Sequence, residues 1–277
     1  CTKLDVLKAD EHLKIINCDM QAYDKLDSII KQEIDVAVSL AWNGTRGNLR
    51  NDESLQQENF QNNKKYLQAM IRLKCKKFFT AGSQAEYGIW TEKEKITEDV
   101  SPNPNTEYGK YKLRFYEYAK SYCSMHDCDL VEPRFFSLYG PDDFQGTLII
   151  SMLKRMLANE PCDLTECIQQ WDFLYIDDAI DALYMLIESK TSNGIYNFGS
   201  GHSAMLKDYI EIMMQITNSK SELNYGAVPY PKTGIVNVNP DIGKLKKTGW
   251  TARVTFEEGI QKIINCQLLQ KESSNSK

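Results

Sequence analysis

Apolar positions in the first half of the chain change period from segment to segment, which predicts alternating strands and helices. Short runs dense in apolar residues alternate with longer runs in which apolar residues recur every three or four positions. A parallel sheet covered by helices produces this order, so the pattern predicts an α/β fold. We expect strands at 13–18, 35–41, 77–81 and 129–135, and helices at 23–32, 52–73 and 106–125.

The second half of the chain has a less regular pattern of apolar positions. It predicts helices at 148–157 and 178–188, a short strand at 173–176, shorter elements at 195–198 and 206–216, and a helix from Phe256 onward. Residues 266–277 are predicted to be a tail, because Lys271 to Lys277 are polar and contain no core-forming side chain.

Composition and charge indicate an ordinary globular protein without a nucleic-acid or membrane partner. The 277 residues are 42% hydrophobic and 26% charged. A net charge of -5 provides no basic surface for phosphate backbones or anionic lipid. No apolar run approaches the roughly 20 residues that span a bilayer, and residues 1–10 have no signal-peptide core. We expect a soluble, cytoplasmic protein.

The eight cysteines and three histidines are scattered along the chain, without a CxxC pair or a cluster of ligand spacing. In a chain of this size without a secretion signal, reduced and mostly buried thiols are favoured over disulfides. We therefore expect no metal site.

Tyr108 and Lys112 form a Tyr-x-x-x-Lys pair near the start of the helix predicted at 106–125. This spacing places both side chains on one helix face, about 5–6 Å apart, where an ammonium would lower the phenol pKa toward that of a general acid or base. In a chain with 15 tyrosines such a pair also arises by chance, and Tyr116 with Lys120 is a second. Tyr108 differs from Tyr116 because it follows a proline-rich loop in the first helical turn, where a cleft can reach it.

Ser83 follows the strand predicted at 77–81 and lies at the carboxyl edge of the sheet, where open α/β sheets bind ligands. Its hydroxyl can hydrogen bond a substrate oxygen while Tyr108 transfers a proton. Serine, glycine and glutamine after a strand are also common in ordinary turns. The residues alone leave a catalytic and a structural interpretation open.

Five segments, in chain order, resemble the landmarks of extended short-chain dehydrogenases that act on nucleotide sugars. They are Ser83-x-x-x-Tyr87-Gly88, Tyr108-Gly109-Lys110-Tyr111-Lys112, the run from Pro133 to Pro141, the run from Trp171 to Asp178, and Asn197-Phe198-Gly199-Ser200-Gly201. The resemblance implies a Rossmann-like, doubly wound parallel sheet with an interleaved smaller substrate domain. We expect the cofactor domain at 1–140 and 173–192, and the substrate domain at 141–172 and 193–265.

The resemblance also implies an activity, which is hydride transfer at C4 of a nucleotide sugar with NAD or NADP as cofactor. Tyr108 would be the acid or base, Lys112 would hold the nicotinamide ribose, and Ser83 would bind the reacting oxygen. The implied cofactor contacts are Asp19, Leu40, Ala41, Trp42, Asn59, Lys112 and Phe135, and the implied substrate contacts are Gln84, Arg46, Ser137 and Trp171. We also expect a homodimer.

The chain departs from the family pattern at its beginning. Members of this family open with a strand and a Gly-x-x-Gly-x-x-Gly turn whose amides hold the pyrophosphate, and this chain begins at Cys1 without them. We interpret the chain as truncated, with the first β-α-β unit missing. The run from Gly199 to Ala204 fits Gly-x-Gly-x-x-Ala, but the resemblance assigns this turn to the substrate side.

Further departures narrow the expected chemistry. Dehydratases of the family carry an Asp-Glu pair where this chain has Gln84 and Ala85, so dehydration is disfavoured. Ser137 stands where asparagine is usual and Trp171 where arginine is frequent, which makes Arg46 a candidate substitute charge. Epimerase and ketoreductase both remain open. The alternative is a non-catalytic nucleotide- or protein-binding protein of the same fold, which the missing glycine turn favours.

Overall fold

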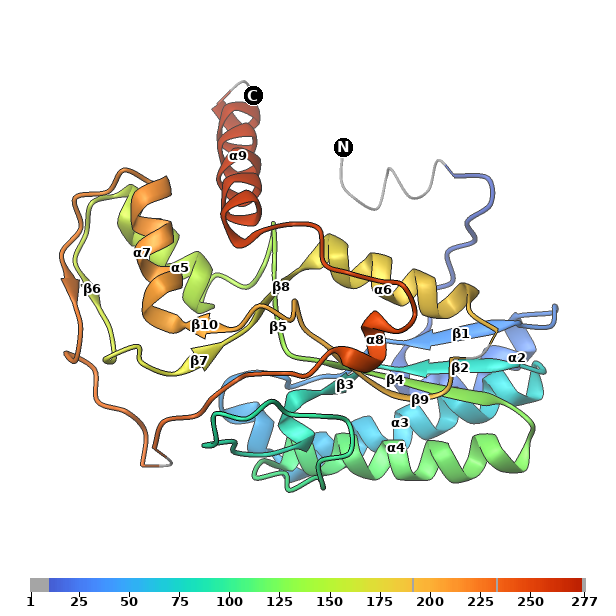
Figure 1. The fold of residues 1–277 in the computed structure, drawn as a ribbon. Helices are drawn as coiled ribbons and strands as arrows, with labels where there is room; N and C mark the ends of the chain where they lie inside the picture. The colour runs from blue at the N-terminus through green and yellow to red at the C-terminus, as the bar shows by residue number, and fades with distance from the viewer. Residues whose placement is uncertain (1–9, 191, 233, 276–277) are drawn as a thin grey trace.

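The computed structural model describes residues 10–190, 192–232 and 234–275, and it contains a parallel sheet with helices on both faces (Figure 1). Every strand pair in this five-stranded sheet is parallel. Its strands are β1 (Val36–Ser39), β2 (Lys77–Thr80), β4 (Asp129–Phe135) and β9 (Gly194–Phe198), with β3 (Gly82–Ser83) paired to β4 beyond the end of β2. This Rossmann-like arrangement confirms the predicted α/β fold class.

The alternation of side chains along the strands builds a core on each face of the sheet. Phe78 and Leu130 pack with helices α3 (Glu53–Arg72) and α4 (Glu107–Met125). Their neighbours Phe79 and Val131 point the other way and pack under helix α6 (Ile176–Glu188). Because both faces are covered, each central strand is apolar on both sides, which explains why it appears in the sequence as a continuous apolar run.

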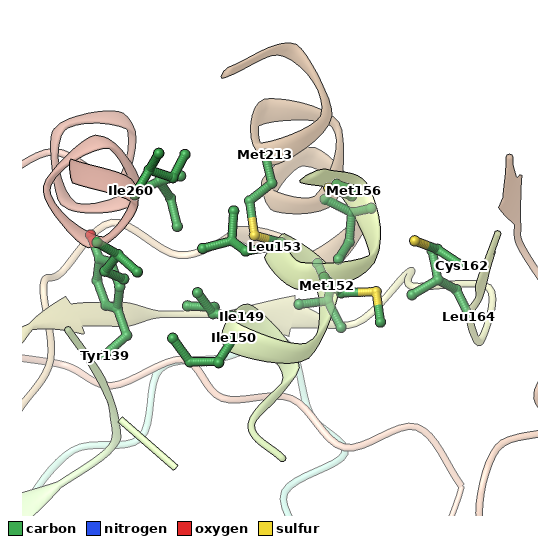
Figure 2. Packing of buried hydrophobic residues seen from close by; sticks show 14 of the residues in the cluster. Tyr139, Ile149, Ile150, Met152, Leu153, Met156, Cys162, Leu164, Met213 and Ile260 are labelled. Carbon is green, nitrogen blue, oxygen red and sulfur yellow. The ribbon is translucent and has the colours of Figure 1, made fainter. Parts of the chain in front are cut away.

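A second core lies beside the sheet and contains many residues of the predicted substrate domain. Helices α5 (Leu148–Leu157), α7 (Leu206–Ile216) and α9 (Phe256–Asn275) pack there against the parallel pair β5 (Ser137–Tyr139) and β8 (Phe173–Tyr175). Figure 2 shows Leu153, Met213 and Ile260 converging from the three helices. The short elements are η1 (Met20–Lys25), α2 (Leu26–Ile29), η2 (Gly47–Asn51), η3 (Gln84–Glu86), β6 (Cys162–Asp163), β7 (Gln170–Trp171), β10 (Ala204–Met205), β11 (Leu223–Asn224) and α8 (Gly243–Lys246).

Four predicted elements or boundaries are wrong. Residues 13–18 form no strand, because no described strand pairs with them, and Leu13 and Ile15 remain 44% and 43% exposed. The helix predicted at 23–32 is a 3₁₀ turn, η1, followed by the single-turn helix α2. Strand β9 belongs to the main sheet although 193–265 was assigned to the substrate domain. Helix α9 also continues to Asn275 through the segment predicted to be a tail.

Within the described residues, no helix combines the length and the apolar character that crossing a bilayer requires. The described cysteines are all free thiols, and most are buried. Cys1 lies outside the described residues.

The glycine pattern at Gly199 serves packing. The buried Asp172 carboxylate accepts the amide N–H groups of Ser200 at 2.7 Å and Gly201 at 2.8 Å. A Cβ atom on Gly199 would lie 2.4 Å from Cγ of Pro240, so only glycine fits there. A carboxylate of the chain therefore occupies the amides that a phosphate would need, which agrees with the rejection of this turn as a dinucleotide site.

We expect Asp172→Ala to lower the free energy of unfolding by about 2–4 kcal/mol, because two buried amides lose their acceptor. Asp177→Ala is the matched control, since Asp177 lies five residues on and is exposed; it should change the free energy by no more than about 0.5 kcal/mol. Urea denaturation followed by circular dichroism measures both values. Similar values for the two variants would show that the amides of the Gly199 turn do not depend on this carboxylate.

Candidate functional site

A cavity of about 480 Å³ lies at the carboxyl edge of the sheet and extends toward the second core. All three predicted catalytic residues line it. Four of the predicted cofactor contacts line it too, namely Leu40, Trp42, Lys112 and Phe135. So do all four predicted substrate contacts, Arg46, Gln84, Ser137 and Trp171. The lining residues that sequence reasoning missed include Arg50, Tyr139, Asp143, Thr147 and Phe173.

The other predicted cofactor contacts, Asp19, Ala41 and Asn59, do not line this cavity. The buried Asn59 amide accepts from the backbone N–H of Asn43 at 2.9 Å and donates to its carbonyl at 2.8 Å. Asp19 caps η1 by accepting from the N–H of Gln21. In this structure Asn59 therefore holds the loop that follows β1, which is the loop that carries Trp42.

Tyr108 lies in the first turn of α4, next to the turn that carries Ser83. A Cβ atom on Gly109 would lie 2.4 Å from the carbonyl oxygen of Ala85, so the glycine after Tyr108 allows the helix to approach this turn closely. Burial raises the pKa of Tyr108, while a hydrogen bond with the Ser83 side chain lowers it in part. The net direction is upward, which keeps the phenol protonated at neutral pH.

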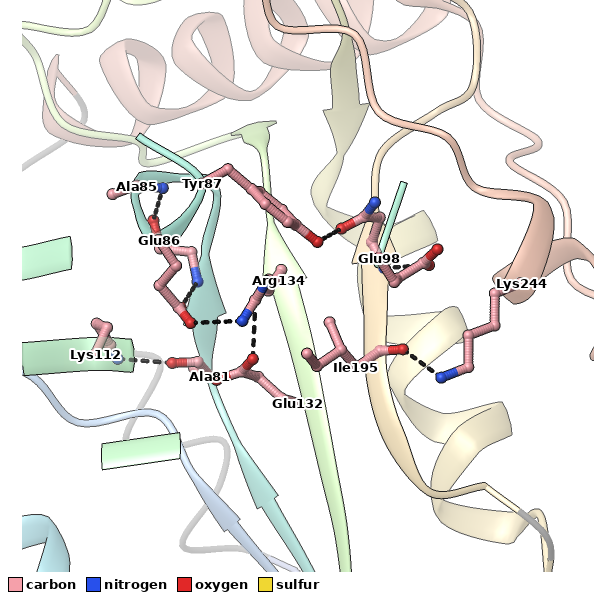
Figure 3. A network of polar contacts seen from close by, with 12 residues as sticks. Ala81, Ala85, Glu86, Tyr87, Glu98, Lys112, Glu132, Arg134, Ile195 and Lys244 are labelled. Carbon is pink, nitrogen blue, oxygen red and sulfur yellow. Dashed lines mark hydrogen bonds and ion pairs between the residues drawn. The ribbon is translucent and has the colours of Figure 1, made fainter. Parts of the chain in front are cut away.

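Lys112 is buried beside Tyr108 with its ammonium group held in place. Nζ donates to the carbonyl oxygen of Ala81 at 2.7 Å and lies 4.1 Å from the centroid of the Trp42 ring (Figure 3 shows the first contact). Burial lowers the pKa of Lys112 to about 8. Nζ is 5.9 Å from the centroid of the Tyr108 ring. The predicted lowering of the Tyr108 pKa by Lys112 is therefore not observed, because the ammonium contacts Ala81 and Trp42 and burial dominates at the phenol.

A network of buried charges supports the serine turn. Glu86 accepts the backbone N–H of Ser83 at 2.7 Å. Glu86 also pairs with Arg134 at 3.1 Å, and Arg134 pairs with Glu132 at 2.9 Å (Figure 3). The side chains of all three charged residues are at most 2% exposed. Burial raises the pKa of both carboxyl groups, and Arg134 opposes this effect. Sequence reasoning missed Glu86, although Ser83-x-x-Glu86 is the pattern of a capping box, which η3 forms.

Two polar atoms in the cavity lining have no partner of their own. Gln84 Oε1, an acceptor, and Trp171 Nε1, a donor, are both buried without a hydrogen bond. Buried polar groups are nearly always hydrogen bonded, so both atoms fit contact with a bound ligand. Arg46 is already paired with Asp143 at 3.1 Å and stacks on Phe144, so its charge is partly neutralised.

Comparisons with known proteins agree with this arrangement. The sequence profile of the "NAD dependent epimerase/dehydratase family" matches residues 2–199. The chain belongs to this family. Over 161 residues it is 33% identical to CDP-abequose synthase of Salmonella muenchen, an alignment that covers 57% of this chain and 55% of that protein. The chain thus spans about half the length of that relative.

Solved structures of similar fold include complexes with nicotinamide cofactors. The NAD complex of UDP-glucuronic acid 4-epimerase from Bacillus cereus superposes with a TM-score of 0.81 at 23% identity, covering 96% of this chain and 84% of the other. RMD from Pseudomonas aeruginosa with NADPH gives 0.83 at 20% identity, covering 95% and 93%. At this level of identity the likeness concerns the fold.

The cofactor class expected from the sequence, NAD or NADP, is that of the epimerase/dehydratase family. The cavity fits the nicotinamide end of such a cofactor, because a lysine and the aromatic rings of Trp42 and Phe135 line it. Among the described residues, the glycine turn at Gly199 has two of its amides bound to Asp172, so it offers no open cradle for the pyrophosphate. The described residues therefore fit the nicotinamide end of the cofactor and not its pyrophosphate.

Removing Arg134 should destabilise this family member strongly. We expect Arg134→Gln to lower the free energy of unfolding by about 3–5 kcal/mol, because two buried carboxylates lose their counter-charge. Arg253→Gln removes a surface pair with Asp181 whose side chains are 76% and 55% exposed, and should cost less than about 1 kcal/mol. Urea denaturation at pH 7 measures both. Equal costs would mean that the two buried carboxyl groups are already neutral.

Proposed function

We propose that this chain contributes the catalytic site of an NAD(P)-dependent nucleotide-sugar epimerase or 4-ketoreductase, with Tyr108 as the acid or base. The observation that carries this proposal is that Ser83, Tyr108 and the buried Lys112 line one cavity at the carboxyl edge of the sheet, where the Ser83 side chain acts to lower the pKa of Tyr108. Membership of an NAD-dependent epimerase/dehydratase family supports the reaction class. The nucleotide sugars in the names of several relatives support the substrate class.

The proposed proton path uses side chains that line the same cavity. The Tyr108 hydroxyl exchanges a proton with the oxygen on sugar C4, and Ser83 holds that oxygen by a hydrogen bond. Lys112 stays charged below about pH 8, and one of its N–H groups donates to the Ala81 carbonyl oxygen. Its remaining N–H groups are available to cofactor ribose hydroxyls. When bound, the nicotinamide would supply hydride exchange at C4.

The residues after Ser83 favour hydride transfer without dehydration. Removal of water needs a separate acid and base, and Gln84 and Ala85 supply neither. Gln84 Oε1 and Trp171 Nε1 are unpartnered in the cavity lining, so we propose that Gln84 Oε1 accepts from a sugar hydroxyl and that Trp171 Nε1 donates to a sugar or phosphate oxygen. An epimerase would retain its NAD through many turnovers, whereas a ketoreductase would consume NADPH stoichiometrically, and cofactor consumption per product distinguishes the two.

A second candidate function is non-catalytic binding of a nucleotide or protein by the same fold. It is favoured by one observation, which is that burial raises the pKa of Tyr108 while the Lys112 ammonium contacts Ala81 and Trp42. In this case nucleotide sugars would bind in the cavity, and no substrate would be converted with either cofactor.

We expect Tyr108→Phe to lower turnover by at least about a hundredfold, the usual scale for loss of a general acid or base, with little change in substrate affinity. Tyr116→Phe is the matched control, because Tyr116 lies on the same helix, is partly buried and does not line the cavity. It should keep its turnover. Steady-state rates with a panel of nucleotide sugars, and with NAD or NADPH, measure both variants.

Near-normal turnover of Tyr108→Phe would reject the role of Tyr108 as acid or base. If the protein bound both a nucleotide sugar and NAD or NADPH and converted none of the panel, the non-catalytic alternative would hold.

A further inference from the structure

Arg50 lies over the ring of Tyr108, and no motif of the sequence predicted this contact. Its guanidinium carbon lies 4.9 Å from the centroid of the Tyr108 ring. Arg50 belongs to η2, and the next residue, Asn51, accepts the backbone N–H of Glu107 through Oδ1 at 3.3 Å. The contact that joins η2 to the first turn of α4 therefore also holds Arg50 over the ring.

Arg50 is the cation best placed to act on the Tyr108 phenol. Within the described part of the chain it forms no ion pair, whereas Arg46, the other arginine of the cavity, is paired with Asp143. Lys112 contributes to the cavity too, but its Nζ is held by the Ala81 carbonyl and the face of Trp42.

The groups around Tyr108 act on its pKa in both directions. Burial raises the pKa of Tyr108, and so does the nearby Glu86 carboxylate. The hydrogen bond with Ser83 lowers it, and Arg50 lowers it as well. A cation over an aromatic face attracts the ring, and it attracts the ring more strongly once the phenol carries a full negative charge.

We propose that Arg50 is a positioning residue that favours the phenolate form of Tyr108 by lying over its ring, a role that the sequence pattern assigns to Lys112. The consequence for catalysis rests on the proposed function, since it matters only if Tyr108 transfers the proton. Arg50 also lines a smaller cavity of about 230 Å³ beyond Gln84, so its guanidinium is accessible and is not fixed by packing on all sides.

The charge of Tyr108 can be measured without cofactor or substrate. The chain, labelled with ¹³Cζ-tyrosine, is titrated by NMR, and Tyr108→Phe identifies the signal among the 15 tyrosines. In Arg50→Gln the fraction of Tyr108 in the phenolate form, at a fixed pH below its midpoint, should fall about threefold or more, the effect of a unit charge at about 5 Å in a mostly aqueous setting. Arg50→Lys keeps the charge and should retain most of that fraction.

Arg114→Gln is the matched control for this titration. Arg114 lies on α4, the helix that carries Tyr108. Its guanidinium carbon is 4.7 Å from the centroid of the Phe60 ring and 5.7 Å from the centroid of the Tyr111 ring. Removing it should leave the Tyr108 titration unchanged. Arg50→Met is a second uncharged variant, and thermal denaturation shows whether each variant is folded.

An unchanged Tyr108 titration in both Arg50→Gln and Arg50→Met would overturn the proposal. So would a rise in KM for the nucleotide sugar with an unchanged pH profile of turnover, because Arg50 would then be a cation that binds the substrate. The expected result is a shift of the acid limb of the turnover profile to higher pH with KM unchanged. If the titration moves while Tyr108→Phe keeps normal turnover, the proposed function fails and the effect of Arg50 on Tyr108 stands.

Discussion

The buried ion pair between Arg134 and Glu86 is the interaction on which the site depends. It connects the carboxyl end of strand β4 to the turn after β3, and Glu86 in turn holds the backbone N–H of Ser83. Buried charges are costly unless each has a partner in good geometry. Ion pairing holds Glu86 beside Arg134, although Glu86 Oε2 and both terminal nitrogens of Arg134 have no hydrogen-bond partner, and the other Glu86 oxygen accepts the Ser83 N–H. A buried polar network therefore fixes the position of the Ser83 backbone more firmly than a surface loop alone would.

Packing around the same turn then determines where Tyr108 lies. Because Gly109 has no side chain, α4 approaches the Ala85 carbonyl closely, and the Thr106 hydroxyl caps the helix by accepting the Gly109 N–H at 3.1 Å. The tyrosine is thereby held beside the Ser83 turn from two directions. The Ser83 turn, the start of α4 and the end of β4 are distant in the chain but meet at one edge of the sheet. They meet there because the strands are parallel and their carboxyl ends lie together.

Sequence reasoning succeeded where local pattern decides structure and was wrong where a partner decides it. The strands over 77–81 and 129–135 were predicted well because burial on both faces leaves a continuous apolar run. Residues 13–18 carry a similar run, but no strand among the described residues pairs with them. Glu86 carried a readable capping-box signal, whereas the contact of Arg50 with Tyr108 arises only from tertiary placement. Asn59 shows that matching a residue to a family position does not determine its contacts in this chain.

Burial shifts the pKa values of Lys112 and Tyr108 in opposite directions. Burial disfavours the charged form of each group. It lowers the pKa of Lys112 to about 8, because the ammonium is charged, and it raises the pKa of Tyr108, because the phenolate is charged. At neutral pH the resting pair is therefore an ammonium beside a neutral phenol. A phenolate there needs nearby groups that offset its desolvation. The Ser83 side chain and Arg50 both act in this direction, and Arg50 lies over the ring while Lys112 is held by Ala81 and Trp42.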